Sequence, residues 1–263
     1  MEAVAASKMK KAQDVARAGT SYERLMAEMA GHVLRFSPGV DHPLLRKRSG
    51  EVDDLVLTIL LTPDRGLCGS LNSNVLRLAE QIIPANGLVI TVGRKATAHA
   101  VKTSWTLVGS VERIGDKPTF ADTLPASSLA LSEYETGTVN KIQMIYSKFV
   151  NTLRQEPVIE QILPFTKLTL TAGEAILRPT YIFEPAGRAI LDELLPAYVR
   201  LAVYQAVLSM KAAEHSARMV AMKQASENAQ DVQKHLILQY NQNRQRQITA
   251  EIADIVTAGL AIG

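Results

Sequence analysis

Residues 197–258 read AYVRLAVYQAVLSMKAAEHSARMVAMKQASENAQDVQKHLILQYNQNRQRQITAEIADIVTA, and these 62 residues contain neither proline nor glycine. A continuous helix of this length extends roughly 90 Å, whereas the average globular helix has about 11–12 residues. A compact domain of this chain length has a radius of gyration of about 18 Å. The segment therefore predicts one helix too long to be enclosed by its own domain, and its projecting part needs a partner.

The apolar pattern of this segment indicates what kind of partner it needs. Alanines recur every fourth residue, at Ala213, Ala217, Ala221, Ala225 and Ala229. A spacing of four advances the stripe by about 40° at each step, so the stripe winds around the helix. The later apolar positions are interrupted by Asn and Gln: Val232, Leu236, Tyr240, Ile248, Ile252 and Ile255. This pattern is not a sustained heptad, and it favours a helix that packs on one short helix and otherwise sits inside something else.

The sequence pattern divides the rest of the chain into a helical segment and an α/β segment. Residues 1–36 predict a helix, which the turn residues SPGVDHP at 37–43 end, and this helix is the expected mate of the long one. Residues 50–186 predict an α/β domain with a parallel sheet that is antiparallel in part. The expected strands are Leu55–Leu61, Leu88–Val92, Trp105–Val108, Ile142–Val150, Val158–Phe165 and Thr180–Phe183, with helices at Ser73–Ile83 and Arg94–Val101.

The stretch TPDRGLCGSLNSN at 62–74 joins the first strand to the first helix of that domain, where nucleotide-binding proteins hold phosphate. Gly66 and Gly69 are present, but no Lys follows them as a P-loop requires. A dinucleotide fingerprint needs a third glycine and an acid after the next strand, and both are missing. The stretch favours a tight turn with Asn72 or Ser73 as the N-cap of the helix.

Composition excludes several classes of site. The net charge of +3 is too small to indicate nucleic acid without a clustered patch. Cys68 is the only cysteine and favours a small packed residue over a nucleophile. The five histidines form no metal or catalytic pattern, and His215 and His235 are expected at a surface or interface. We predict no catalytic residue, no metal and no cofactor. The N-terminus also lacks the pattern of a signal peptide.

Three blocks identify the chain as similar to a known family: MEAVAASKMKKAQ at 1–13, DRGLCGSLN at 64–72, and AAEHSARMVAMKQASENA at 212–229 with YNQNRQRQITAEIADIV at 240–256. They resemble the gamma subunit of F-type ATP synthase, and HPLL at 42–45 and YIFEP at 181–185 also fit. The resemblance implies an antiparallel coiled coil of N- and C-terminal helices, 1–36 and 187–260, with a Rossmann-like α/β domain, 50–186, inserted between them.

The resemblance also implies a function. The gamma subunit is the central-stalk shaft that couples proton flow through the c-ring to the conformational cycle of the catalytic beta subunits, and it is itself non-catalytic. Its implied partners are the alpha and beta subunits, epsilon and the membrane c-ring, with no nucleic acid and no small-molecule substrate. The implied location is the cytoplasmic face of the bacterial inner membrane, as a peripheral protein.

Residue roles carry over by motif. Met1, Lys8 and Met9 on the first helix and Arg218 on the last are expected opposite beta, and Arg244, Gln245, Thr249 and Glu251 are expected at the alpha–beta ring. The family's signature loop comprises Asp64, Arg65, Gly66, Cys68, Gly69 and Asn72, and is a structural and contact element. Lys10 and Lys11 are expected at the surface.

Family members usually carry more N-terminal helix before the block at 1–13, so either the true start lies upstream or the shaft has a shorter first helix. Two other readings of the residues remain. A Rossmann-type enzyme predicts that the isolated chain binds ATP or NAD. A coiled-coil scaffold predicts a homodimer formed through the long helix.

Overall fold

The computed structural model describes residues 2–36, 42–45, 55–165, 184 and 187–260. Contacts divide the chain into two compact units, Met1–Val220 and Ala221–Gly263, and each is described by itself. The expected strand Thr180–Phe183 falls outside the described residues. Within the described ranges, no helix combines the length and the apolar character that a bilayer-spanning helix needs.

The first unit contains a five-stranded sheet in the order β3-β2-β1-β4-β5. Its strands are β1 (Val56–Leu61), β2 (Leu88–Val92), β3 (Thr106–Val111), β4 (Lys141–Phe149) and β5 (Gln155–Leu163). The pairs β1–β2, β2–β3 and β1–β4 are parallel, and β4–β5 is antiparallel. The predicted mixture of parallel and antiparallel strands is therefore confirmed.

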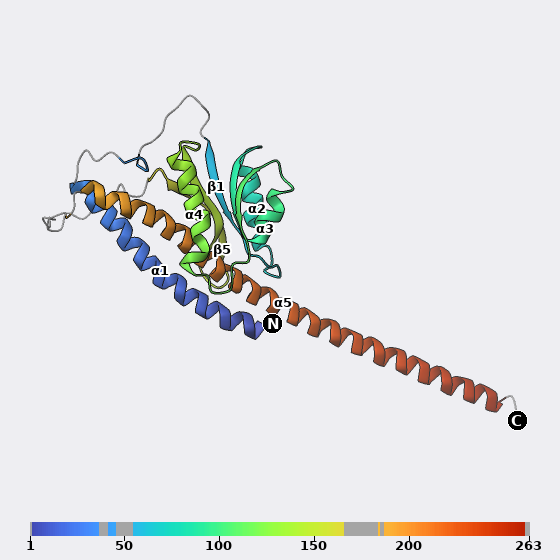
Figure 1. Cartoon of the computed structure of the whole chain (residues 1–263). Helices are drawn as coiled ribbons and strands as arrows, with labels where there is room; N and C mark the ends of the chain where they lie inside the picture. The colour runs from blue at the N-terminus through green and yellow to red at the C-terminus, as the bar shows by residue number, and fades with distance from the viewer. Residues whose placement is uncertain (1, 37–41, 46–54, 166–183, 185–186, 261–263) are drawn as a thin grey trace. The chain divides into compact units, whose positions relative to one another are not determined.

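Helices cover both faces of this sheet (Figure 1). The helices are α1 (Glu2–Phe36), α2 (Leu71–Ile82), α3 (Arg94–Ala100), α4 (Phe120–Glu135) and α5 (Gly187–Leu260). Successive strand residues point to opposite faces, so Ile59 packs in the core shared with α1, α4 and α5, whereas Leu60 packs with α2 and α3.

Helix α4 has no counterpart among the sequence predictions. Pro125 lies inside it, and proline normally argues against a helix interior. A start signal was nevertheless present, because the backbone N–H of Thr119 donates to Asp122 Oδ2 at 2.7 Å, as in a capping box. Ala126, Ala130 and Tyr134 then bury one face of α4 in the main core.

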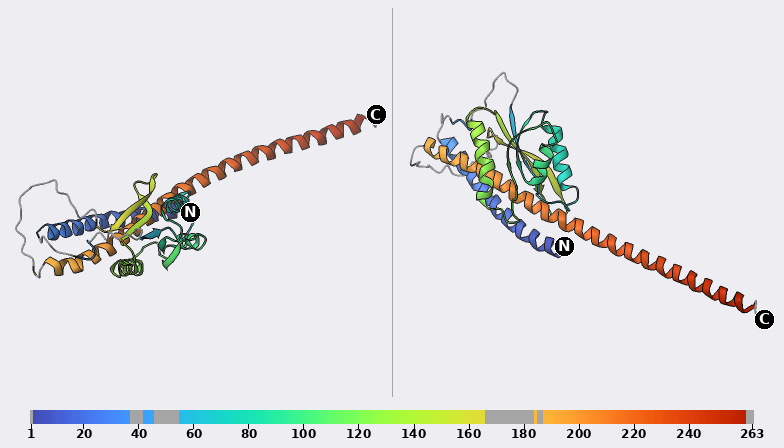
Figure 2. Two further views of the ribbon diagram at one scale, coloured as in Figure 1. Left: turned by 90° about the horizontal axis from the view of Figure 1, so that it is seen from above. Right: turned by 45° about the vertical axis from the view of Figure 1, so that its right-hand side comes forward.

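Helices α1 and α5 pack side by side in antiparallel fashion in the first unit (Figures 1 and 2). Ala16 of α1 clusters with Leu208 and Ala212 of α5. Farther along α1, Ala30 and Val33 lie in the core with Leu191 and Leu195, which come earlier in α5. The predicted antiparallel pair of N- and C-terminal helices is confirmed.

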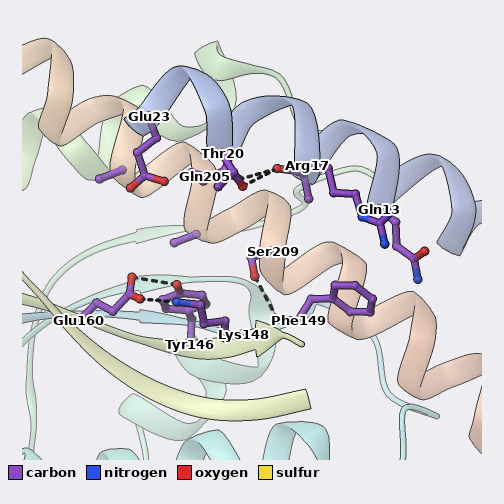
Figure 3. Close-up of a pocket in the computed structure, with 13 residues that line it drawn as sticks. Gln13, Arg17, Thr20, Glu23, Tyr146, Lys148, Phe149, Glu160, Gln205 and Ser209 are labelled. Carbon is purple, nitrogen blue, oxygen red and sulfur yellow. Dashed lines mark hydrogen bonds and ion pairs between the residues drawn. The ribbon is translucent and has the colours of Figure 1, made fainter. Parts of the chain in front are cut away.

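Gln205 of α5 and Gly19 of α1 lie in close contact between the two helices. The Gln205 amide Nε2 donates to the Ala16 carbonyl at 2.6 Å and to Thr20 Oγ1 at 2.9 Å. A Cβ on Gly19 would lie only 2.1 Å from Gln205 Oε1. Gln205, Ala16 and Thr20 border a cavity of about 240 Å³ between α1, α5 and strands β4 and β5 (Figure 3). The glycine lets the amide reach the α1 backbone and so sets the register of the two helices.

The second unit is the C-terminal part of α5, which continues without a break from the first. Every described side chain from Lys223 to Thr257 is exposed. In the alanine stripe, Ala213 is fully buried, Ala217 and Ala221 are half-buried, and Ala225 and Ala229 are exposed. The single long helix predicted from the sequence is confirmed.

We predict that Gly19→Ala destabilises the chain although alanine favours helix by about 1 kcal/mol over glycine. The added Cβ would force Gln205 from its hydrogen bonds, and overpacking of this kind costs about 1–3 kcal/mol. Denaturant unfolding should show a lower free energy of unfolding for Gly19→Ala. The double variant Gly19→Ala/Gln205→Ala should recover part of the loss. A gain in stability from Gly19→Ala alone would contradict the packing described here.

Candidate subunit interface

The signature loop leads from β1 into α2 and packs on α5. The Cys68 side chain is 2% exposed and clusters with Leu71 and with Ala213 of α5. Arg218 of α5 donates through Nη2 to the Gly66 carbonyl at 3.3 Å. Burial raises the pKa of the Cys68 thiol, more than the nearby Arg218 lowers it. The thiol is therefore a packed group, as predicted, and not an activated nucleophile.

The turn itself differs from the prediction in one respect. Leu67 and Gly69 both have left-handed backbones, with φ of 60° and 58°. These two residues reverse the chain early, so α2 begins at Leu71, immediately after Ser70. The predicted N-cap at Asn72 or Ser73 is thus wrong, because both lie in the first turn of the helix. The Asn72 amide instead donates to Cys68 Sγ at 3.4 Å.

Asp64 joins the segments that follow three neighbouring strands. Its Oδ1 accepts from the backbone N–H of Arg94 at 2.9 Å and from that of Arg113 at 3.3 Å. These N–H groups lie at the carboxyl edge of a parallel sheet, where doubly wound proteins bind phosphate. The chain's own carboxylate already occupies them, so Asp64 has a structural role.

The crevice that would hold a ligand is also filled. In an open α/β sheet the ligand crevice lies where the strand order reverses, which here is between β1 and β4. Phe149, the last residue of β4, packs against the cluster of Cys68 and Ala213. Its backbone N–H donates to Ser209 Oγ on α5 at 3.1 Å. Helix α5 thus covers the switch point.

Three arginines surround an open cavity of about 460 Å³ beside this edge. Arg65, Arg94 and Arg113 follow β1, β2 and β3 in turn, and all three are exposed. Within the described ranges, none of their guanidinium groups has a carboxylate partner in an ion pair. The cavity can accept acidic groups of a neighbouring molecule, since arginine pairs well with carboxylates.

A buried ionic cluster on α5 supports the loop. Glu214 Oε2 accepts from Lys211 Nζ at 3.0 Å, and Glu214 Oε1 accepts from Arg218 Nη2 at 2.7 Å. The side chains of Lys211, Glu214 and Arg218 are 4%, 2% and 16% exposed. Sequence reasoning identified only Arg218. The i, i+3 and i, i+4 spacing of these charges was the signal for the other two.

The interface residues predicted on α1 have different surroundings. Lys8 is half-exposed and its Nζ lies 2.5 Å from Asp116 Oδ2, in the segment between β3 and α4. Met9 is half-buried, and Met1 lies outside the described residues. Lys10 and Lys11 are exposed, as predicted. Lys8 therefore has an intrachain partner that the sequence did not reveal.

The four residues predicted at the alpha–beta ring all lie in the second unit and all are exposed. Gln245 offers its carbonyl to the Thr249 hydroxyl at 2.8 Å, and Glu251 accepts from Gln247 Nε2 at 3.1 Å. Both are local contacts along one helix. Arg244 adds an exposed cation beside them. This group leaves its side chains available to a neighbour.

His215 corrects another expectation. It was placed at a surface or interface, but its side chain is 1% exposed, while His235 is exposed as expected. His215 lies on the face of α5 that meets the 112–119 segment, where its Nε2 is 3.8 Å from Asp116 Oδ1. Among the described residues, no cluster of three His, Cys, Asp or Glu side chains could hold a metal ion.

We predict that Glu214→Ala lowers the free energy of unfolding by about 3–5 kcal/mol, because it leaves buried cations without their carboxylate. Glu227→Ala is the matched control, since Glu227 forms an i, i+4 pair with Lys223 on the same helix with both side chains exposed. That control should leave stability almost unchanged. Denaturant unfolding measures both effects. Equal losses of unfolding free energy in the two variants would contradict the stabilising role of the cluster.

Comparison with known proteins agrees with this arrangement. Residues 1–262 match the sequence model of the family described as ATP synthase. The ATP synthase gamma chain of Ralstonia nicotianae is 39% identical over 100% of this chain and 92% of that one. The gamma chain of Pelotomaculum thermopropionicum is likewise 39% identical, with the same coverage.

Solved structures share the fold. The chain resembles one in the Tetrahymena thermophila mitochondrial ATP synthase central stalk and c-ring, with a TM-score of 0.60 and 24% identity over 86% of this chain and 97% of that one. A chain of the Euglena gracilis mitochondrial ATP synthase gives a TM-score of 0.61 and 18% identity over 99% and 94%. With its full-length match to the family and to curated gamma chains, this chain belongs to the ATP synthase gamma chain family.

Proposed function

We propose that this gamma-family chain is the rotating shaft of a proton-translocating F-type ATP synthase and is itself non-catalytic. The observation that supports this most is the exposed C-terminal part of α5. A helix of 74 residues, of which all described side chains from Lys223 to Thr257 are exposed, has no stabilising core of its own in that part. Such a helix gains its packing from other subunits.

The exposed apolar side chains indicate how those other subunits are arranged around the helix. Nine large apolar residues of the second unit are 43% to 72% exposed: Val232, Leu236, Ile237, Leu238, Tyr240, Ile248, Ile252, Ile255 and Val256. At about 100° per residue they spread over roughly two thirds of the helix circumference. One partner helix covers a narrow stripe, so a sleeve of several subunits fits better. We infer that the sleeve is the ring of alpha and beta subunits.

The first unit contains buried contacts that would transmit torque between α5 and the rest of that unit. One charge moving through 100 mV supplies about 2.3 kcal/mol, so several crossings must be pooled through one shaft for each ATP. The buried Glu214 cluster and the Gln205 contact join α5 to the rest of this unit. We propose that this unit is held by epsilon and the c-ring at the cytoplasmic face of the bacterial inner membrane.

The predicted interface residues differ in how freely their side chains could contact another subunit. Arg244, Gln245, Thr249 and Glu251 are exposed and suit contacts with the sleeve. Met1, Lys8, Met9 and Arg218 are proposed opposite beta, but Lys8 and Arg218 would have to share their charge with Asp116 and Glu214. The exposed arginines at 65, 94 and 113 suit an acidic segment of a neighbouring subunit. We retain the three-part division at 1–36, 50–186 and 187–260 as a proposal.

The rotor proposal predicts that Ile248→Asp/Ile252→Asp lowers ATP-driven proton pumping by inverted membrane vesicles at least tenfold more than it lowers ATP hydrolysis. Charges at these positions would enter an apolar sleeve and carry a desolvation cost. Val101→Asp is the control, because Val101 is apolar and 73% exposed but lies at the C-cap of α3, in the first unit. It should change the ratio of pumping to hydrolysis by less than about twofold.

Affinity purification of the tagged chain from membranes gives the companion test. Alpha and beta subunits should be recovered with it. A homodimer that lacks them would support the scaffold reading. Binding of ATP or NAD by the isolated chain would support the enzyme reading. Either result would contradict the rotor proposal.

A further inference from the structure

His215 is a buried imidazole without the hydrogen bonds that buried polar groups normally make. Its side chain is 1% exposed, and neither Nδ1 nor Nε2 has a hydrogen-bond partner in the described part of the chain. Buried polar side chains nearly always have at least one partner. The ring therefore lies in a site that stabilises its neutral form only by packing.

Asp116 lies between this ring and the first helix. Its Oδ2 binds Lys8 Nζ of α1 at 2.5 Å, and its Oδ1 lies 3.8 Å from His215 Nε2 of α5. A distance of 3.8 Å is too long for a hydrogen bond. One carboxylate thus holds a lysine on α1 while facing a histidine on α5 that it does not yet bind.

Other charges decide which carboxylate a protonated His215 would use. Glu214 is adjacent, but its Oε1 and Oε2 already accept from Arg218 and Lys211. The charged groups that act directly on the ring are Glu214, Asp116, Arg218 and Lys211. Lys8 acts on it indirectly, through its bond to Asp116. The other charged residues nearby line the neighbouring cavity: Asp64, Arg65, Arg94 and Arg113. Asp116 Oδ1 is the oxygen left to receive a proton-bearing Nε2.

We propose that His215 is a proton-sensitive element in the joint between α1, α5 and the 112–119 segment. When His215 takes up a proton, Asp116 moves toward it by about 1 Å to reach the distance of a charge-assisted bond. The movement weakens the hold of Asp116 on Lys8, so the first turns of α1 loosen from the rest of the unit. Loss of the proton restores the Lys8–Asp116 pair.

The direction in which the stability of this joint changes with pH follows from the pKa of His215. Burial lowers the pKa of His215 below 6.5, and Arg218 and Lys211 act in the same direction, whereas Glu214 and Asp116 oppose them. The open or unfolded chain therefore binds the proton more readily than the closed one. The closed joint therefore has its full stability above pH 6.5 and loses stability as the pH drops below that value. The equilibrium constant between the closed and the open joint falls by at most about tenfold per pH unit, because one proton is bound.

Hydrogen exchange of the full-length chain tests the proposal. Amide protection in residues 2–16, corrected for intrinsic rates, should fall severalfold between pH 7.5 and pH 5.5 in the unmodified chain. His215→Gln keeps a similar size without a titrating ring and should reduce this change to less than about twofold. His235→Gln replaces an exposed histidine of the same helix and should keep the original response. Equal responses in all three would overturn the proposal.

Asp116→Asn provides a second arm that does not depend on the folding of His215→Gln. Histidine ring NMR should show that His215 titrates below pH 6.5 and that Asp116→Asn moves its titration to lower pH, because the carboxylate that favours the charged ring is gone. A titration that Asp116→Asn leaves unchanged would refute the pairing. The experiment uses the isolated chain, so its outcome is separate from the rotor proposal.

Discussion

One helix has to satisfy two opposite packing conditions, and the rest of the structure depends on this constraint. Between Leu191 and Ser216, α5 supplies buried side chains to the core beneath the sheet and to the contact with α1. From Lys223 to Thr257 the same helix exposes every described side chain. Helix propensity alone does not hold such a long segment in place. Its buried half is fixed by tertiary packing, and its exposed half needs packing from other molecules.

The buried half also fills the place where doubly wound α/β proteins bind nucleotides. Phe149 and Cys68 pack against α5 at the point where the strand order reverses, and Asp64 accepts the backbone N–H groups of the neighbouring segments. The features that would cradle a phosphate have become the surface that fixes the shaft. In the rotor that we propose, torque would pass through these same contacts, because they join the sheet to the helix.

Much of the fold could be predicted from local sequence because its signals are local. The absence of Pro and Gly from 197–258 predicts the long helix, and apolar runs predict the first two strands. Helix α4 could not be predicted in the same way, since Pro125 and several serines resemble a loop and its burial against the sheet decides the outcome. The site shows the same limit. Motifs identified Arg218 and the signature loop, and the i, i+4 spacing from Arg218 was a signal for Glu214. Asp116, the partner of Lys8, becomes apparent only when segments about 100 residues apart in sequence meet.

The central claim is that the apolar surface of the second unit is free in the isolated chain and enclosed in the assembled complex. Maleimide labelling of Ile252→Cys measures this directly, because the only native cysteine, Cys68, is 2% exposed and gives little background. The account predicts rapid labelling of the isolated chain, in which Ile252 is 56% exposed, and strong protection in the complex purified from membranes. Equal labelling rates in the two states would contradict it.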